Sequence, residues 1–140
     1  VIRSTTLLPF TQYHDQFHLN SMVLDVTAIK DSTTAVLRTL TVPTGINVLA
    51  EGLVDVDVSG PVNEATLISD IAETDQSASN ALGRASIIVN STASQFGSFF
   101  RCRTNTSAQV RTRGSVIDIG SILRVTTRGW IDVRGKNGGL

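Results

Sequence analysis

Apolar and polar residues alternate strictly in three segments near the C-terminal end. Residues 100–103 read FRCR, 108–113 read AQVRTR and 123–128 read LRVTTR, and Arg holds most of the polar places. Side chains on a strand point to its two faces in turn, so a period of two indicates a strand with one buried and one solvated face. We therefore expect these three segments to be strands of a half-buried sheet.

The first two segments are separated by residues 104–107, a TNTS run that favours a turn. The pattern predicts a hairpin in which Cys102 faces Val110 and Arg101 faces Arg111. Like charges directly opposite each other destabilise a sheet, so the outer face needs anions from another strand, another subunit or a ligand. The arginines expected on that face are Arg101, Arg103, Arg111 and Arg113.

An acidic ladder earlier in the chain is the expected complement of these arginines. Residues 46–59 read INVLAEGLVDVDVS, and beyond Gly52 the valines alternate with Asp55 and Asp57. A Gly inside a strand suggests a bulge or a sharp bend. We expect Asp55 and Asp57 to face outward and to pair with the Arg face, within one chain or across a subunit contact.

Trp130 is the single Trp of the chain and follows the third alternating segment. The alternation predicts that Ile131 and Val133 point inward and that Trp130 shares the outward side with Asp132 and Arg134. An exposed Trp beside Arg is typical of the centre of a protein interface. The other interpretation is that Arg side chains simply cover the ring, with a small cation–π gain.

Further strands are expected upstream. Apolar, β-branched runs bounded by turn residues occupy Ser21–Ile29, Thr34–Val42, Thr66–Ile71 and Ala85–Asn90. With the segments above they make about eight or nine short strands, which predicts an antiparallel β-sandwich, with any helix limited to one or two turns in 69–84. The length of 140 residues indicates one such domain, over 21–135, followed by a flexible tail at 136–140.

Residues 1–20 differ from the rest of the chain. They show no clean period, Pro9 interrupts them, and they contain half of the Phe and Tyr residues: Phe10, Tyr13 and Phe17. An aromatic segment that cannot fold alone usually packs on something else. We interpret 1–20 as an extended N-terminal arm, with one short strand or turn, that attaches the chain to a neighbouring subunit or another protein.

Charge is balanced overall but unevenly distributed. The formal net charge is +0, yet residues 1–100 carry four basic and ten acidic side chains and residues 101–140 carry eight and two. A basic end is one sign of a nucleic-acid surface. Self-complementary pairing needs fewer assumptions, because ten of the twelve cations are Arg, which suits bidentate pairing with carboxylates. We expect no nucleic-acid partner, and with no long apolar run, no membrane span.

The sequence contains only weak candidates for metal-binding or catalytic sites. His14 and His18 could share a helix face as metal ligands, and the acids of 70–75 could collect calcium, but neither set has supporting spacing. Cys102 is better interpreted as a small buried hydrophobe than as a nucleophile. The pair Asp55 and Asp57 is the arrangement nearest to glycosidase carboxylates, although alternating strand acids are commoner. We expect no enzyme activity, no catalytic residues, no metal and no cofactor.

Two motifs carry a family resemblance. Residues 101–113, RCRTNTSAQVRTR, and 128–135, RGWIDVRG, resemble the C-terminal region of a group of bacteriophage virion proteins that includes tail-fibre and related surface proteins. That group has an R-x-R-T-N-T-S-x-Q-(I/V)-R-x-R segment and a terminal G-W-I-D-x-R-G. The resemblance covers roughly residues 35–136, and Cys102 departs from it where another apolar residue would serve.

The resemblance implies a jelly-roll-like β-sandwich that assembles as a homotrimer on a virion. The expected function is a structural virion component: a tail fibre, a capsid decoration or a connector that contacts other virion proteins. The alternative is an adhesin module that binds host cell-surface polysaccharide on the same fold. Fold alone does not choose between them.

Overall fold

The computed structural model describes residues 2–3, 6–29, 32–58, 62–79, 81–91, 94–115 and 121–134. All regular secondary structure in these ranges is β-strand, which confirms the predicted all-β class. The same ranges contain no helix long and apolar enough to cross a bilayer. The strands are β1 (Ile2–Arg3), β2 (Thr6–Leu7), β3 (Phe10–Tyr13), β4 (Gln16–Ile29), β5 (Val36–Thr39), β6 (Leu49–Val58), β7 (Val62–Ser69), β8 (Ile87–Ser91), β9 (Ser94–Arg103), β10 (Gln109–Gly114) and β11 (Ile122–Ile131).

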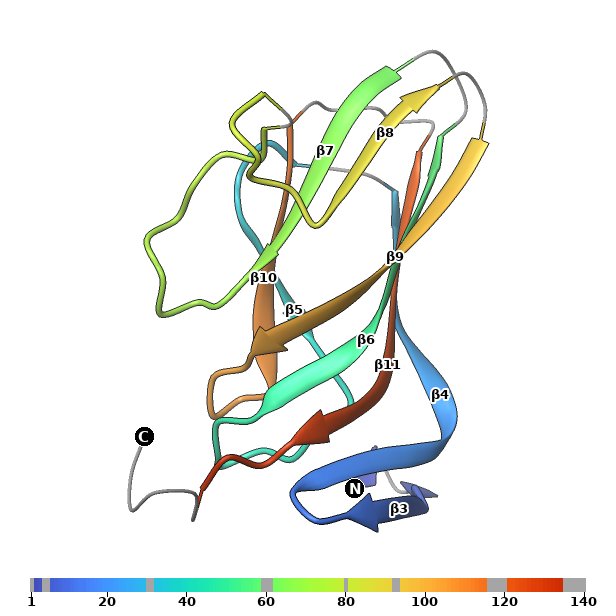
Figure 1. The fold of residues 1–140 in the computed structure, drawn as a ribbon, viewed down its shortest axis with the longest axis vertical. Helices are drawn as coiled ribbons and strands as arrows, with labels where there is room; N and C mark the ends of the chain where they lie inside the picture. Colours follow the sequence, from blue (N-terminus) through green and yellow to red (C-terminus); the bar gives the residue numbers. More distant parts are fainter. Residues whose placement is uncertain are drawn as a thin grey trace.

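Two antiparallel sheets pack face to face as a β-sandwich (Figure 1). One has five strands in the order β3-β4-β11-β6-β9, and the other has four in the order β5-β10-β7-β8. A separate pair, β1 and β2, lies outside both sheets. The sandwich is the predicted architecture, whereas jelly-roll connectivity stays a prediction.

The predicted hairpin between the two Arg-bearing strands is wrong. β9 pairs with β6 in the five-stranded sheet, and β10 pairs with β5 and β7 in the other sheet. The turn at 104–107 therefore carries the chain from one layer of the sandwich to the other. Arg101 lies opposite Glu51, and Arg111 lies opposite Leu37 and Ser69, so the two arginines do not face each other.

The core lies between the sheets and follows the alternation of the strands. In β6 the valines at 54, 56 and 58 are buried, as the sequence pattern predicts. They meet Leu123 and Val125 of β11 and Val110 of β10 in one hydrophobic cluster. Burial of such side chains is the main favourable contribution to the folding free energy.

The five-stranded sheet bends where β11 changes register against both of its neighbours. Thr127 pairs with Gly52 and Gly129 with Glu51, so Arg128 is an extra residue in β11. The strands approach so closely here that a Cβ on Gly52 would lie 2.0 Å from the carbonyl oxygen of Thr126. The Gly inside the 46–59 run thus marks a bend, as expected, and the bend depends on a residue without a side chain.

The second half of the predicted arm belongs to the sandwich. β3 and the start of β4 form a hairpin at the edge of the five-stranded sheet, with Phe10 opposite Leu19 and Tyr13 opposite Gln16. Figure 1 shows β4 curving sharply into this hairpin at the lower end of the molecule. Attachment to a neighbouring subunit or virion protein stays a prediction for 1–20, and the tail at 136–140 lies outside the described residues.

We predict that Gly52→Ala destabilises the fold by about 3 kcal/mol or more, because the new Cβ would meet backbone rather than a movable side chain. Urea unfolding followed by circular dichroism measures this change. Gly97→Ala is the matched control, since its Cβ would have no neighbour closer than 3.8 Å. Equal stability of the two variants would contradict the role assigned to Gly52.

Candidate functional site

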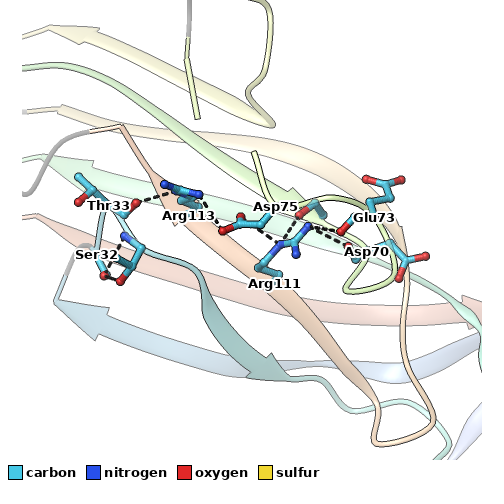
Figure 2. Close-up of polar contacts among 9 residues, drawn as sticks. Ser32, Thr33, Asp70, Glu73, Asp75, Arg111 and Arg113 are labelled. Atoms are coloured by element: carbon cyan, nitrogen blue, oxygen red, sulfur yellow. Dashed lines mark hydrogen bonds and ion pairs between the residues drawn. The ribbon is translucent and has the colours of Figure 1, made fainter. Parts of the chain in front are cut away.

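Arg111 holds the segment after β7 against β10 and is not an outward-facing residue. Its side chain is buried, and it donates hydrogen bonds to Ser69 Oγ and to the carbonyl oxygens of Asp70 and Glu73, each at 3.1 Å. Its Nε also lies 3.5 Å from a carboxylate oxygen of Asp75. Figure 2 shows the guanidinium enclosed by this segment. The predicted exposure of Arg111 is wrong because long-range packing covers the outer side of β10.

Arg113 extends the same network. Its Nη1 donates to Asp75 Oδ2 at 2.8 Å, and its Nε donates to the carbonyl oxygen of Thr33 at 2.6 Å. Asp75 therefore lies between two guanidiniums, as Figure 2 shows, which removes the repulsion expected from two arginines on one strand. For Arg111 and Arg113, the anion that the sequence required is Asp75 of the same chain.

The arginines of β9 have other partners. Arg101 pairs with Glu51, directly opposite it in the five-stranded sheet, with Nε donating to Oε1 at 2.8 Å. Arg103 is half-exposed and lies 3.8 Å from an Asp70 carboxylate oxygen. The arginines of β9 and β10 thus divide between both sheets and do not form one basic face.

The acidic ladder pairs with a different arginine from those expected. Arg124 of β11 lies 2.9 Å from Asp55 and 3.5 Å from Asp57, and Gln95 donates to Asp55 at 2.8 Å. The hydrogen bond with Asp55 is the main reason that the pKa of Arg124 is raised. Asp55 and Asp57 do face outward, but sheet register places β11 rather than the other arginines beside them.

Trp130 is buried, with 3% exposure, so its predicted outward position is wrong. The extra residue Arg128 shifts the alternation by one place, which turns Trp130 to the inner face opposite Ala50. Its ring stacks on Phe17 at 5.1 Å between centroids and meets Phe10 edge-on at 5.6 Å. The aromatic residues of the predicted arm therefore pack on their own chain.

Tyr13 and the two histidines lie around the turn of this hairpin. Tyr13 is 62% exposed, and its ring lies edge-on to His18 at 6.3 Å between centroids. His14 sits in the turn with a φ of 55°. Within the described ranges, no three His, Cys, Asp or Glu side chains gather as a metal site would require, and this includes the acids of 70–75.

An exposed apolar row crosses the outer face of the five-stranded sheet and was missed by the sequence analysis. Leu24 of β4 lies opposite Thr126 of β11, which lies opposite Leu53 of β6, which lies opposite Phe99 of β9. The three apolar side chains are 49%, 42% and 49% exposed. Leu53 lies two residues before the outward Asp55, and Phe99 lies two residues before the outward Arg101. Residues two apart on a strand point to the same face, so the alternation predicted that Leu53 and Phe99 face outward.

Comparison with protein-family models, with curated proteins and with solved structures gives no match to this chain.

We predict that Arg111→Gln lowers the free energy of unfolding by about 3 kcal/mol, because it leaves buried acceptors without their charged donor. Urea unfolding measures the loss. Arg134→Gln is the control, because its pair with Asp132 is on the surface and contributes only about 1 kcal/mol or less. A smaller loss for Arg111→Gln than for Arg134→Gln would contradict the network in Figure 2.

Cys102 is a buried thiol on the inner face of β9, and burial raises its pKa to about 12, with a further increase from the charges of Asp70 and Glu73. Because the thiolate is the reactive form, we predict that iodoacetamide at pH 8 modifies native Cys102 at least about 100-fold more slowly than the unfolded chain. Mass spectrometry of the native and urea-unfolded protein follows the reaction. Comparable rates in the two states would show that the thiol is accessible.

Proposed function

We propose that this chain is a non-enzymatic structural component of a bacteriophage virion, a tail-fibre, decoration or connector protein that assembles as a homotrimer. The observation that supports self-assembly most directly is the apolar row formed by Leu24, Leu53 and Phe99. The virion and the number of three chains rest on the family resemblance of residues 101–113 and 128–135.

The apolar row has the composition of an interface centre. Large apolar side chains that lie exposed in one continuous row usually mark a contact surface, whereas scattered ones do not. The charged residues beside the row are already paired within the chain: Arg101 with Glu51, and Arg124 with Asp55. An apolar centre with a polar rim is the usual anatomy of a protein interface.

The charge of this surface favours a second copy of the chain as its occupant. Because the rim consists of closed ion pairs and the chain has a formal net charge of +0, three copies of this face can gather around a common axis without net repulsion. The three large side chains of the row are apolar and require no complementary charge from a different protein. This contact takes the place of the expected one through Arg111 and Trp130, which are buried in their own chain.

The positions of the outward acids support a non-enzymatic role. Asp55 and Asp57 both contact Arg124 on an open sheet face. Glycoside hydrolysis needs one carboxylic acid that protonates the leaving group and a second carboxylate on the other side of the bond. Two carboxylates on one strand that share one guanidinium suit an ion-pair network better than that arrangement.

A receptor-binding adhesin module that recognises host polysaccharide is the second candidate function. One observation favours it: a polar cavity of ≈ 660 Å³ beside β7. Its volume falls in the range of small-molecule sites.

We predict that the unmodified chain has the mass of three chains in light scattering at micromolar concentration, and that Leu53→Lys shifts it to the monomer. The substitution would place an unpaired ammonium at the centre of the apolar contact, where desolvation is costly. Circular dichroism checks that the variant keeps its fold.

The control is Leu37→Lys, which changes a Leu of similar exposure, 54%, on β5 of the other sheet and should leave the oligomer intact. A monomeric unmodified protein would refute self-assembly. An unchanged oligomer for Leu53→Lys would place the contact elsewhere.

A further inference from the structure

A cavity of ≈ 660 Å³ lies between the end of β7 and the loop that leads to β8. Figure 1 shows this loop projecting beside β10, away from the outer face of the five-stranded sheet. The cavity is lined mainly by small and polar residues. They include Ser69, Ala72, Glu73, Thr74, Gln76 and Arg84.

Arg84 is the unusual member of this lining. Its Nε is buried and has no hydrogen-bond partner among the residues that the structure describes. Within the described ranges, its guanidinium also has no carboxylate within ion-pair distance, unlike Arg101, Arg111 or Arg124. A guanidinium in the wall of a cavity that no carboxylate of the described residues neutralises is suited to pair with an anionic ligand in that cavity.

The backbone around Arg84 is held from both sides, so the site is built before any ligand arrives. Arg84 and Ser79 exchange two backbone hydrogen bonds of 2.9 Å. Two residues further on, the hydroxyl of Ser86 accepts from the backbone N–H of Ile68 at 2.9 Å, which ties the loop to β7. A fixed backbone lowers the entropy lost when a ligand binds.

The opposite wall is held by the network of Figure 2. Arg111 binds the backbone carbonyl oxygens of Asp70 and Glu73, which places the Glu73 side chain at the cavity without using its carboxylate in that contact. Glu73 is a fixed negative charge in the lining. It favours a ligand with a single negative charge over a phosphate dianion, because a second charge would be repelled.

We propose that the cavity beside Arg84 binds the carboxylate of an acidic saccharide, with Arg84 as the carboxylate-binding residue. A guanidinium presents paired N–H donors that match the two oxygens of a carboxylate. The hydroxyl and amide side chains of Ser69, Thr74 and Gln76 provide donors and acceptors for sugar hydroxyls, and no aromatic ring is in the lining. This assignment rests on the cavity alone, so it holds for a structural component as well as for an adhesin.

The test is isothermal titration calorimetry of the full chain with three probes: trigalacturonic acid, the neutral trisaccharide maltotriose, and sodium phosphate. Binding of the acidic trisaccharide alone is the expected result. Equal binding of maltotriose would overturn the role of the carboxylate, and tighter binding of phosphate would overturn the discrimination assigned to Glu73. No binding of the acidic trisaccharide at millimolar concentration would overturn the proposal as a whole.

Arg84→Gln should weaken binding of trigalacturonic acid at least about tenfold, since it removes a charge-assisted pair. It should keep the melting temperature, because the Arg84 Nε makes no hydrogen bond that the substitution could remove. Arg128→Gln is the matched control, an exposed Arg outside the cavity, and should leave affinity unchanged. Equal affinities of the Arg84→Gln and unmodified proteins would contradict the site.

A second variant tests the cavity without touching the cation. Ala72 is exposed and lies in the lining, so Ala72→Trp fills the space while Arg84 stays in place. It should reduce affinity to a similar extent as Arg84→Gln, and full affinity would place the ligand elsewhere. Light scattering on the same samples separates this result from self-assembly, since neither substitution lies near Leu53 or Phe99.

Discussion

The close approach of β11 to β6 and β4 at two glycines is the constraint on which the rest of the structure depends. A Cβ at Gly52 would lie 2.0 Å from the backbone of Thr126, and one at Gly129 would lie 2.1 Å from the backbone of Phe17. Only residues without a side chain allow the three strands to bend together at this point. The bend brings the β3–β4 hairpin over Trp130 and closes that end of the core.

The same bend is stabilised by a carboxylate that joins several segments. Asp25 is the extra residue where β4 shifts register against β11. Its oxygens accept hydrogen bonds from the backbone N–H of Thr41, at 2.8 Å, and from the hydroxyls of Thr41 and Thr127. One side chain therefore links β4, β11 and the segment that follows β5 of the opposite sheet. Charge-assisted hydrogen bonds of this kind are stronger than neutral ones.

Internal pairing of the arginines determines which surfaces are left for function. Arg111 and Arg113 form ion pairs with Asp75 in the 70–75 segment, and Arg124 forms one with Asp55 of the acidic ladder. Two surfaces of the described residues lie outside these ion pairs: an apolar row on one sheet and a polar cavity beside the other. These surfaces are spatially separate, so a structural role through the first and ligand binding at the second are compatible in one chain.

The alternation of side chains was sufficient to predict the all-β class, the approximate positions of the strands after residue 20 and the buried valines of β6, because the pleat of a strand is a local property. The same alternation also predicts that Leu53 faces outward. The alternation could not predict which strands pair with each other. The TNTS run at 104–107 has residues typical of a hairpin turn, yet it connects strands of different sheets. Local sequence specifies that the chain turns there, but not which strand lies alongside.

Tertiary structure alone decided the partners of the charges and the direction of Trp130. One extra residue at Arg128 turns Trp130 to the inner face, and a period of two gives no indication of such a shift. Likewise, the pairing of Asp75 with two arginines, and the absence of a partner for the Arg84 Nε, follow from how a long loop folds back on β7 and β10. The sequence by itself determined that this chain makes half-buried strands rich in Arg, because that depends only on neighbouring residues. Which arginines are buried, paired or left in a cavity depends on contacts between residues far apart in the chain, and only the assembled sandwich sets them.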